Sequence, residues 1–140
     1  MRMRGGSIRT SPCDRRDAAL RLAQAKKLLE QADVVAVERK NPAAADGAAS
    51  LAILAGIAAS DAGCCAALGR RSRSQNHLDA TQLLVEIHPA GKDAANALRR
   101  LLSVKDKANY GIVSVSGADL DGVLRHAQAL VAFAEAVMLR

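Results

Sequence analysis

Aromatic residues are almost missing from this chain. Tyr110 and Phe133 are the only two among 140 residues and tryptophan is absent, although half of the residues are apolar. A core without large rings must be built from Ala, Leu, Val and Ile, as in helices that approach one another closely. The composition argues against a β-rich fold and predicts an all-α protein, and the length suits a single domain.

Cysteine is also scarce, and its arrangement is typical neither of a disulfide framework nor of a zinc site. The three residues, Cys13, Cys64 and Cys65, are odd in number and two of them are neighbours. The basic start at 1–9 is not followed by the apolar segment of a secretory signal. We therefore predict a reducing, cytoplasmic location, and we expect no metal and no cofactor.

Most of the chain has no net charge. The whole excess of +6 lies in residues 1–27, which hold eight Lys or Arg and two Asp. Such a basic arm could approach nucleic acid, or it could be a solvated tail and helix face. No aromatic residues lie between these charges to stack bases, so we prefer the second interpretation.

Capping residues divide the chain into a tail and about five helices. Residues 1–10 have few apolar side chains and are predicted to be a disordered tail, whereas 11–140 should form one helical domain. The predicted helix starts are Ser11 followed by Pro12, Asn41 followed by Pro42, Asn76, about Lys92, and Ser116. Gly111 should end the fourth helix, and residues 112–115 should be an extended connection.

The second predicted helix, 41–68, is the most apolar segment. Its interior has no proline and only two charged residues, both aspartate, and Gly69 follows it. Because it is apolar on nearly all sides and mostly alanine, we predict a buried bundle axis rather than a membrane span. Asp61 then needs a charged partner or a groove to face. The expected partners are Lys105, Lys107 and Arg125.

Three segments, taken in order, resemble a HEPN domain: the small-residue helix at 51–65, the helix opened by His77 at 76–84, and Lys-Asp-Lys-Ala-Asn-Tyr-Gly at 105–111. The resemblance covers about residues 42–139. It implies an up-and-down bundle of four or five helices, often a homodimer. It also implies a role in RNA cleavage, nucleotide binding or partnership with a nucleotidyltransferase in toxin–antitoxin pairs.

In nuclease members of that family an Arg precedes a His by a few residues, and the resemblance suggests Arg71 and His77 for this pair. The His would help to activate a ribose 2′-hydroxyl, and the Arg would stabilise charge on the phosphate without a metal. Further binding candidates are Arg70, Arg73, Asp61, Lys105, Lys107 and Tyr110.

The same residues also have structural interpretations. Arginines after a helix offset its dipole and stay solvated, and a histidine at a helix start is commonly a surface or capping residue. The fourth predicted helix, which carries Lys105, Lys107 and Tyr110, contains no His. This favours an RNA-, nucleotide- or partner-binding module without catalysis. A metal-independent, toxin-type endoribonuclease using Arg71 and His77 is the alternative. A helix-turn-helix DNA-binding protein built on residues 69–87 is a third interpretation.

Overall fold

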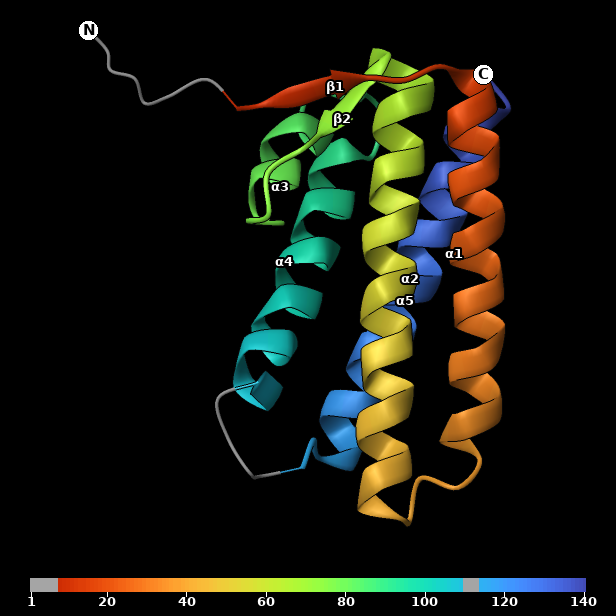
Figure 1. Cartoon of the computed structure of the whole chain (residues 1–140), viewed down its shortest axis with the longest axis vertical. Helices are drawn as coiled ribbons and strands as arrows, with labels where there is room; N and C mark the ends of the chain where they lie inside the picture. The colour runs from red at the N-terminus through yellow and green to blue at the C-terminus, as the bar shows by residue number, and fades with distance from the viewer. Residues whose placement is uncertain (1–7, 110–113) are drawn as a thin grey trace, which may run out of the picture.

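The computed structural model of the protein describes residues 8–109 and 114–140, and the side chains of all of these except 107–109. This part of the chain contains five α-helices: α1 (Arg15–Ala36), α2 (Pro42–Leu68), α3 (Asp79–Leu84), α4 (Gly91–Asn109) and α5 (Gly117–Met138). Figure 1 shows the four long helices running up and down along the long axis, with the short α3 at the end where α2 finishes. The predicted all-α class and up-and-down bundle are confirmed.

Helix α2 is the axis of the bundle, as predicted. Asn41 caps its start by accepting a hydrogen bond from the backbone N–H of Ala43, and Gly69 ends it in the left-handed conformation with φ 71°. Figure 1 shows α2 between α1, α4 and α5, all of which pack against it. By length and composition alone α2 would suit a membrane span, but 72% of its most apolar window is buried inside the bundle. Its apolar surface is therefore used for contacts between helices.

Two glycines in α2 allow its neighbours to come close. A methyl group at Gly56 would overlap Leu101 of α4 and lie 3.2 Å from Leu130 Cδ1 of α5, and both leucines are fully buried. At Gly63 the methyl group would lie 2.9 Å from Phe133 Cε2. The close approach of α4 and α5 to the axis therefore requires glycine at these two positions.

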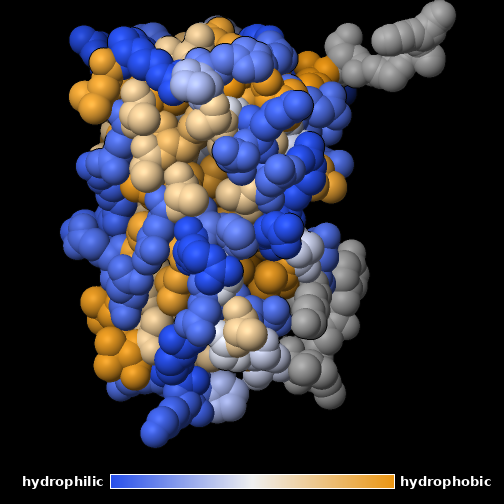
Figure 2. All heavy atoms as spheres, turned by 180° about the vertical axis from the view of Figure 1, so that it is seen from behind, coloured by the Kyte–Doolittle hydropathy of each residue, from blue (hydrophilic) through white to orange (hydrophobic). Residues whose placement is uncertain are grey.

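Large hydrophobic side chains that remain exposed are spread over several elements. Among the described side chains they are Leu20, Val34, Val37, Leu54, Leu78 and Leu139. Figure 2 shows one face of the molecule, on which the strongly hydrophobic residues lie in small groups with hydrophilic side chains between them. Most large apolar side chains of the described residues are in the core, where they form one cluster around α2.

A small β-ladder crosses the end of the bundle. Strand β1 (Thr10–Pro12) pairs antiparallel with β2 (Arg70–Ser72), and Ser11 lies opposite Arg71. Residue 10 therefore belongs to a strand and not to the predicted disordered tail, and residues 1–7 of that tail lie outside the described part of the chain. The left-handed Gly69 turns the chain back across the end of α2, which leaves the backbone of 70–72 free to pair.

The ladder moves the start of the first helix. Ser11 and Pro12 were the expected cap and first helical residue, but both belong to β1, and the cap is Asp14. Its carboxylate accepts a hydrogen bond from Asp17 N, and the Asp17 carboxylate accepts one from Asp14 N, each at 2.9 Å. This reciprocal capping box fixes the start at Arg15.

A disulfide joins Cys13, next to β1, to Cys65 in the last turns of α2, with their Cα atoms 5.3 Å apart. The expectation that the cysteines form no disulfide is therefore wrong, because two of the three meet once β1 lies across the end of α2. Cys64 is a buried free thiol. The cytoplasmic location stays a prediction, but it no longer has support from the cysteines, since stable disulfides are typical of oxidising compartments.

The later helix starts agree more closely with prediction. Ser116 caps α5 by accepting a hydrogen bond from Asp119 N at 3.0 Å, as expected. α3 instead begins at Asp79, and Asn76 accepts a hydrogen bond from Leu78 N at 3.1 Å in a turn before the helix. In the predicted connection at 112–115, Val115 N donates to Asp46 Oδ1 at 2.9 Å, and Gly111 with residues 112–113 lies outside the described chain.

The packing at Gly56 can be tested directly. Gly56→Ala should destabilise the fold by about 1–3 kcal/mol, because the buried Leu101 and Leu130 must move to admit a methyl group. Gly47→Ala is the matched control, since the nearest atom outside its own turn, Val35 Cγ1, would be 3.8 Å away. This change should stabilise α2 by roughly 0.5–1 kcal/mol. Urea unfolding curves compare the two variants, and equal stabilities would contradict the packing described.

Candidate functional site

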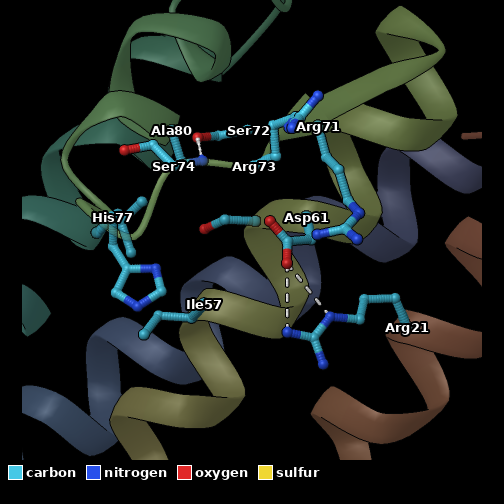
Figure 3. A pocket seen from close by; sticks show the side chains of 11 residues that line it. Arg21, Ile57, Asp61, Arg71, Ser72, Arg73, Ser74, His77 and Ala80 are labelled. Atoms are coloured by element: carbon cyan, nitrogen blue, oxygen red, sulfur yellow. Dashed lines mark hydrogen bonds and ion pairs between the residues drawn. The ribbon is translucent and has the colours of Figure 1, made fainter. Parts of the chain in front are cut away.

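A cavity of about 170 Å³ lies between α1, α2, α4 and the segment that follows β2. Polar and charged side chains make up most of its lining. The lining residues are Arg21, Ile57, Ser60, Asp61, Arg71, Ser72, Arg73, Ser74, His77, Ala80 and Leu98. Figure 3 shows the Asp61 carboxylate inside this space, with the Arg21 guanidinium bonded to it and the His77 ring on the other side. Four of the residues singled out from the sequence thus meet here.

The segment between β2 and α3 is shaped by short polar side chains. Ser72 Oγ accepts a hydrogen bond from Ser74 N at 3.2 Å, and Ser74 Oγ accepts one from Asn76 N at 3.0 Å. Asn76 then accepts from the backbone of the residue after His77. This series of side-chain to backbone bonds curls residues 72–78 beside the part of α2 that carries Asp61. Arg71 and His77, six positions apart, therefore line the same cavity.

Asp61 forms an ion pair with Arg21 of α1. The Arg21 Nε and Nη2 atoms donate to Asp61 Oδ2 at 3.3 and 3.2 Å, and the Asp61 side chain is 12% exposed. The expected partners Lys105 and Arg125 are therefore wrong, and the Lys107 side chain lies outside the described part. The physical reason is that α1 packs along this face of α2 and brings its basic side to the carboxylate.

Burial shifts the pKa of both titratable groups toward their neutral forms. Desolvation raises the pKa of Asp61 above its usual value, although Arg21, Arg71 and His77 oppose this shift. Desolvation and the nearby Lys105 lower the pKa of His77 below 6.5, against the opposing effect of Asp61. His77 is therefore neutral at pH 7 and able to accept a proton.

Positive charge is in excess around the cavity. Arg21, Arg71 and Arg73 line it, against the single carboxylate of Asp61. Within residues 8–109 and 114–140, the side chains of Arg71 and Arg73 form no ion pair. A cavity with three guanidinium groups and one carboxylate favours an anionic ligand, and planar guanidinium groups suit phosphate or carboxylate oxygens.

The remaining predicted site residues are not in this cavity. Arg70 points to Glu86, with its Nη2 atom 2.9 Å from Glu86 Oε1. Lys105 of α4 acts on the pKa of His77 but does not line the cavity. Tyr110 and the side chain of Lys107 lie outside the described residues. Among the described side chains, no three His, Cys, Asp or Glu residues lie close enough together to hold a metal ion.

Sequence reasoning missed Arg21 and the serines as cavity residues. Arg21 belonged to the basic segment at 1–27, which we interpreted as a solvated face. Nothing in the sequence around Arg21 indicated that it would pair with Asp61, which lies 40 positions further along the chain. The signal that was available is the aspartate in an alanine-rich helix, because such a buried carboxylate requires a cation from a neighbouring element.

Compared with models of protein families, with curated proteins and with solved structures, the chain matches none of them. The resemblance to HEPN domains therefore stays a prediction made from the three segments of sequence. What the cavity does has to be argued from its own residues.

The electrostatic coupling in the cavity predicts how His77 titrates. Its imidazole pKa, followed by the ring proton shifts in NMR, should lie below 6.5 in the native protein. Asp61→Asn should lower it further by removing a stabilising negative charge, whereas Lys105→Met should raise it by removing a repulsive positive one. A pKa unchanged in both variants would show that His77 does not face these groups.

Proposed function

We propose that this chain is a HEPN-like binding module whose cavity holds the phosphate group of a nucleotide or of an RNA strand. The observation that carries the proposal is the set of three arginines around one cavity, two of them without an ion-pair partner among the described residues. Arginine is the side chain best suited to bind phosphate oxygens through two parallel hydrogen bonds.

The size and polarity of the cavity support this proposal. A volume of about 170 Å³ is several times the roughly 30 Å³ that one water occupies in the liquid, so a tetrahedral oxyanion has room. Arg71 and Arg73 lie on the rim, where both are exposed, whereas Asp61 lies below them and is buried. An anion entering from solvent would meet these two exposed guanidinium groups before the buried carboxylate.

The ion pair of Asp61 with Arg21 sets the strength of such a site. The carboxylate neutralises Arg21 and repels an incoming anion, so it limits affinity while holding Arg21 in place. Two opposite effects are therefore expected from charge removal in the same cavity. Loss of Arg71 should weaken the binding of an anion, and loss of the Asp61 charge should strengthen it.

Titration of the protein with adenosine 5′-monophosphate and with a short RNA, followed by NMR shifts, tests this expectation. Arg71→Ala should weaken binding roughly tenfold or more, the usual effect of losing one charge-assisted hydrogen bond. Asp61→Asn should bind more tightly than the native protein. Arg125→Ala, an exposed arginine of α5 outside the cavity, is the charge-matched control. If it weakens binding as much as Arg71→Ala, the site is not this cavity.

A second candidate function is metal-independent cleavage of RNA, and one observation favours it. Arg71 and His77 line the same cavity, and burial keeps the imidazole neutral at pH 7 by lowering its pKa. A neutral His77 would accept the proton of a ribose 2′-hydroxyl, whose oxygen then attacks the adjacent phosphorus. The 5′-oxygen would leave and take a proton from solvent, and a 2′,3′-cyclic phosphate would remain.

Incubation of purified protein with total RNA in excess EDTA separates binding from cleavage. If the protein is a nuclease, native protein should produce fragments with cyclic phosphate ends, and His77→Ala should abolish them. His126→Ala, which removes a histidine of α5 outside the cavity, should cleave like the native protein. Intact RNA with the native protein rejects the nuclease and leaves the binding module. The homodimer, the nucleotidyltransferase partner and the absence of membrane association stay predictions.

A further inference from the structure

A second, larger pocket adjoins the candidate anion site. It has a volume of about 490 Å³, and it shares two of its lining residues, Arg21 and Arg71, with the smaller cavity. Both half-cystines of the disulfide, Cys13 and Cys65, also line it. The disulfide and the two arginines therefore face one solvent-connected space. A small molecule that enters this pocket can reach the disulfide beside the anion site.

Strand β1 depends on this disulfide for its position. Apart from the three paired residues of the ladder, its flanks are held by two backbone hydrogen bonds, Cys13 N to Gly69 O and Arg73 N to Arg9 O, each at 3.0 Å, and by the partly buried Ile8, which packs against the core. Two isolated strands are marginally stable in water, so the covalent link to α2 is the strong attachment. Without it, β1 would open by local unfolding more readily than the helices.

The arginines of the anion site are tied to the same ladder. Arg71 lies in β2 opposite Ser11 of β1, and Arg73 donates its backbone N–H to β1's neighbour Arg9. Opening of β1 removes these constraints from both arginines and takes away the Pro12 and Cys13 wall of the larger pocket. The backbone that presents the two guanidinium groups then becomes more mobile.

We propose that the Cys13–Cys65 disulfide is a redox switch of the anion site, closed and binding when oxidised, open and weakly binding when reduced. This inference rests on the proposed function and names the regulation of the same site. The reductant is a small dithiol. One of its thiolates attacks the sulfur of Cys13, which is more exposed than Cys65, and the bond between the sulfur atoms of Cys13 and Cys65 breaks. The second thiol of the reductant then closes its own disulfide, so that two electrons and two protons pass to Cys13 and Cys65.

The neighbouring Cys64 does not compete in this exchange. It is buried, and desolvation together with the Asp61 charge raises the pKa of its thiol to about 12. A thiol that stays protonated at neutral pH is a poor nucleophile toward a disulfide. The two redox forms therefore differ only in the Cys13–Cys65 link, which gives them one free thiol and three free thiols, respectively.

Binding of adenosine 5′-monophosphate to the oxidised protein, before and after treatment with dithiothreitol, tests the switch. Thiol counts in denaturant define the two forms, and circular dichroism follows the helices. Reduction should weaken binding roughly fivefold or more, as expected when only a fraction of molecules keeps the site assembled. Cys13→Ser should bind like the reduced form and ignore the reductant. Cys64→Ser, which keeps the disulfide, should respond like the native protein.

The other outcomes separate this inference from the proposed function. Equal affinity of both redox forms overturns the switch and leaves the anion site standing. Three free thiols in the air-oxidised protein, or loss of helical signal on reduction, also overturns it, because the disulfide would then be absent or would hold the whole bundle. No binding of the nucleotide by the oxidised form overturns both the switch and the proposed function.

Discussion

Close approach of helices to α2 is the constraint from which the rest of the molecule follows. With alanines and two glycines along much of its buried surface, α2 lets the leucines and the phenylalanine of α4 and α5 pack close to its backbone, and α1 also packs against it. Most of the axis is buried between these helices until Gly69 ends it, and the ladder crosses the end of the bundle at that point. Asp61 lies about two turns before this end, so the one buried carboxylate of the axis opens toward the segment that follows it.

The electrostatics of the cavity depend on this placement. Burial favours the neutral forms of Asp61 and His77, whereas a guanidinium group is by its chemistry charged throughout the physiological pH range. The positive character of the site therefore comes from guanidinium groups and changes little with pH. Asp61 and His77 are the titratable groups of a cavity whose positive charge comes from the arginines.

Capping residues and apolar patterns in short stretches of sequence predicted most of the helices. They could not predict contacts between residues that are far apart in the chain. The caps at Asn41 and Ser116 and the buried axis could be read from short stretches of sequence, because they depend on neighbouring residues. The ladder joins residues about sixty positions apart, the disulfide spans 52 and the Arg21–Asp61 pair 40. Each depends on how the helices pack and not on neighbouring residues in the sequence. Ser11 is an example: Ser11 followed by Pro12 is a typical helix start, but in the structure Ser11 pairs with Arg71 in the ladder and Asp14 caps the helix.

Between β2 and α3, the residues that shape the segment are different from the titratable residue that it carries. Ser72, Ser74 and Asn76 curl this segment through bonds from their side chains to the backbone, and the His77 side chain takes no part in them. A different residue at position 77 would therefore occupy the same place without refolding the segment. The side chain at position 77 can therefore change without a change in the scaffold, so the shape of the cavity and the titratable group inside it can vary independently.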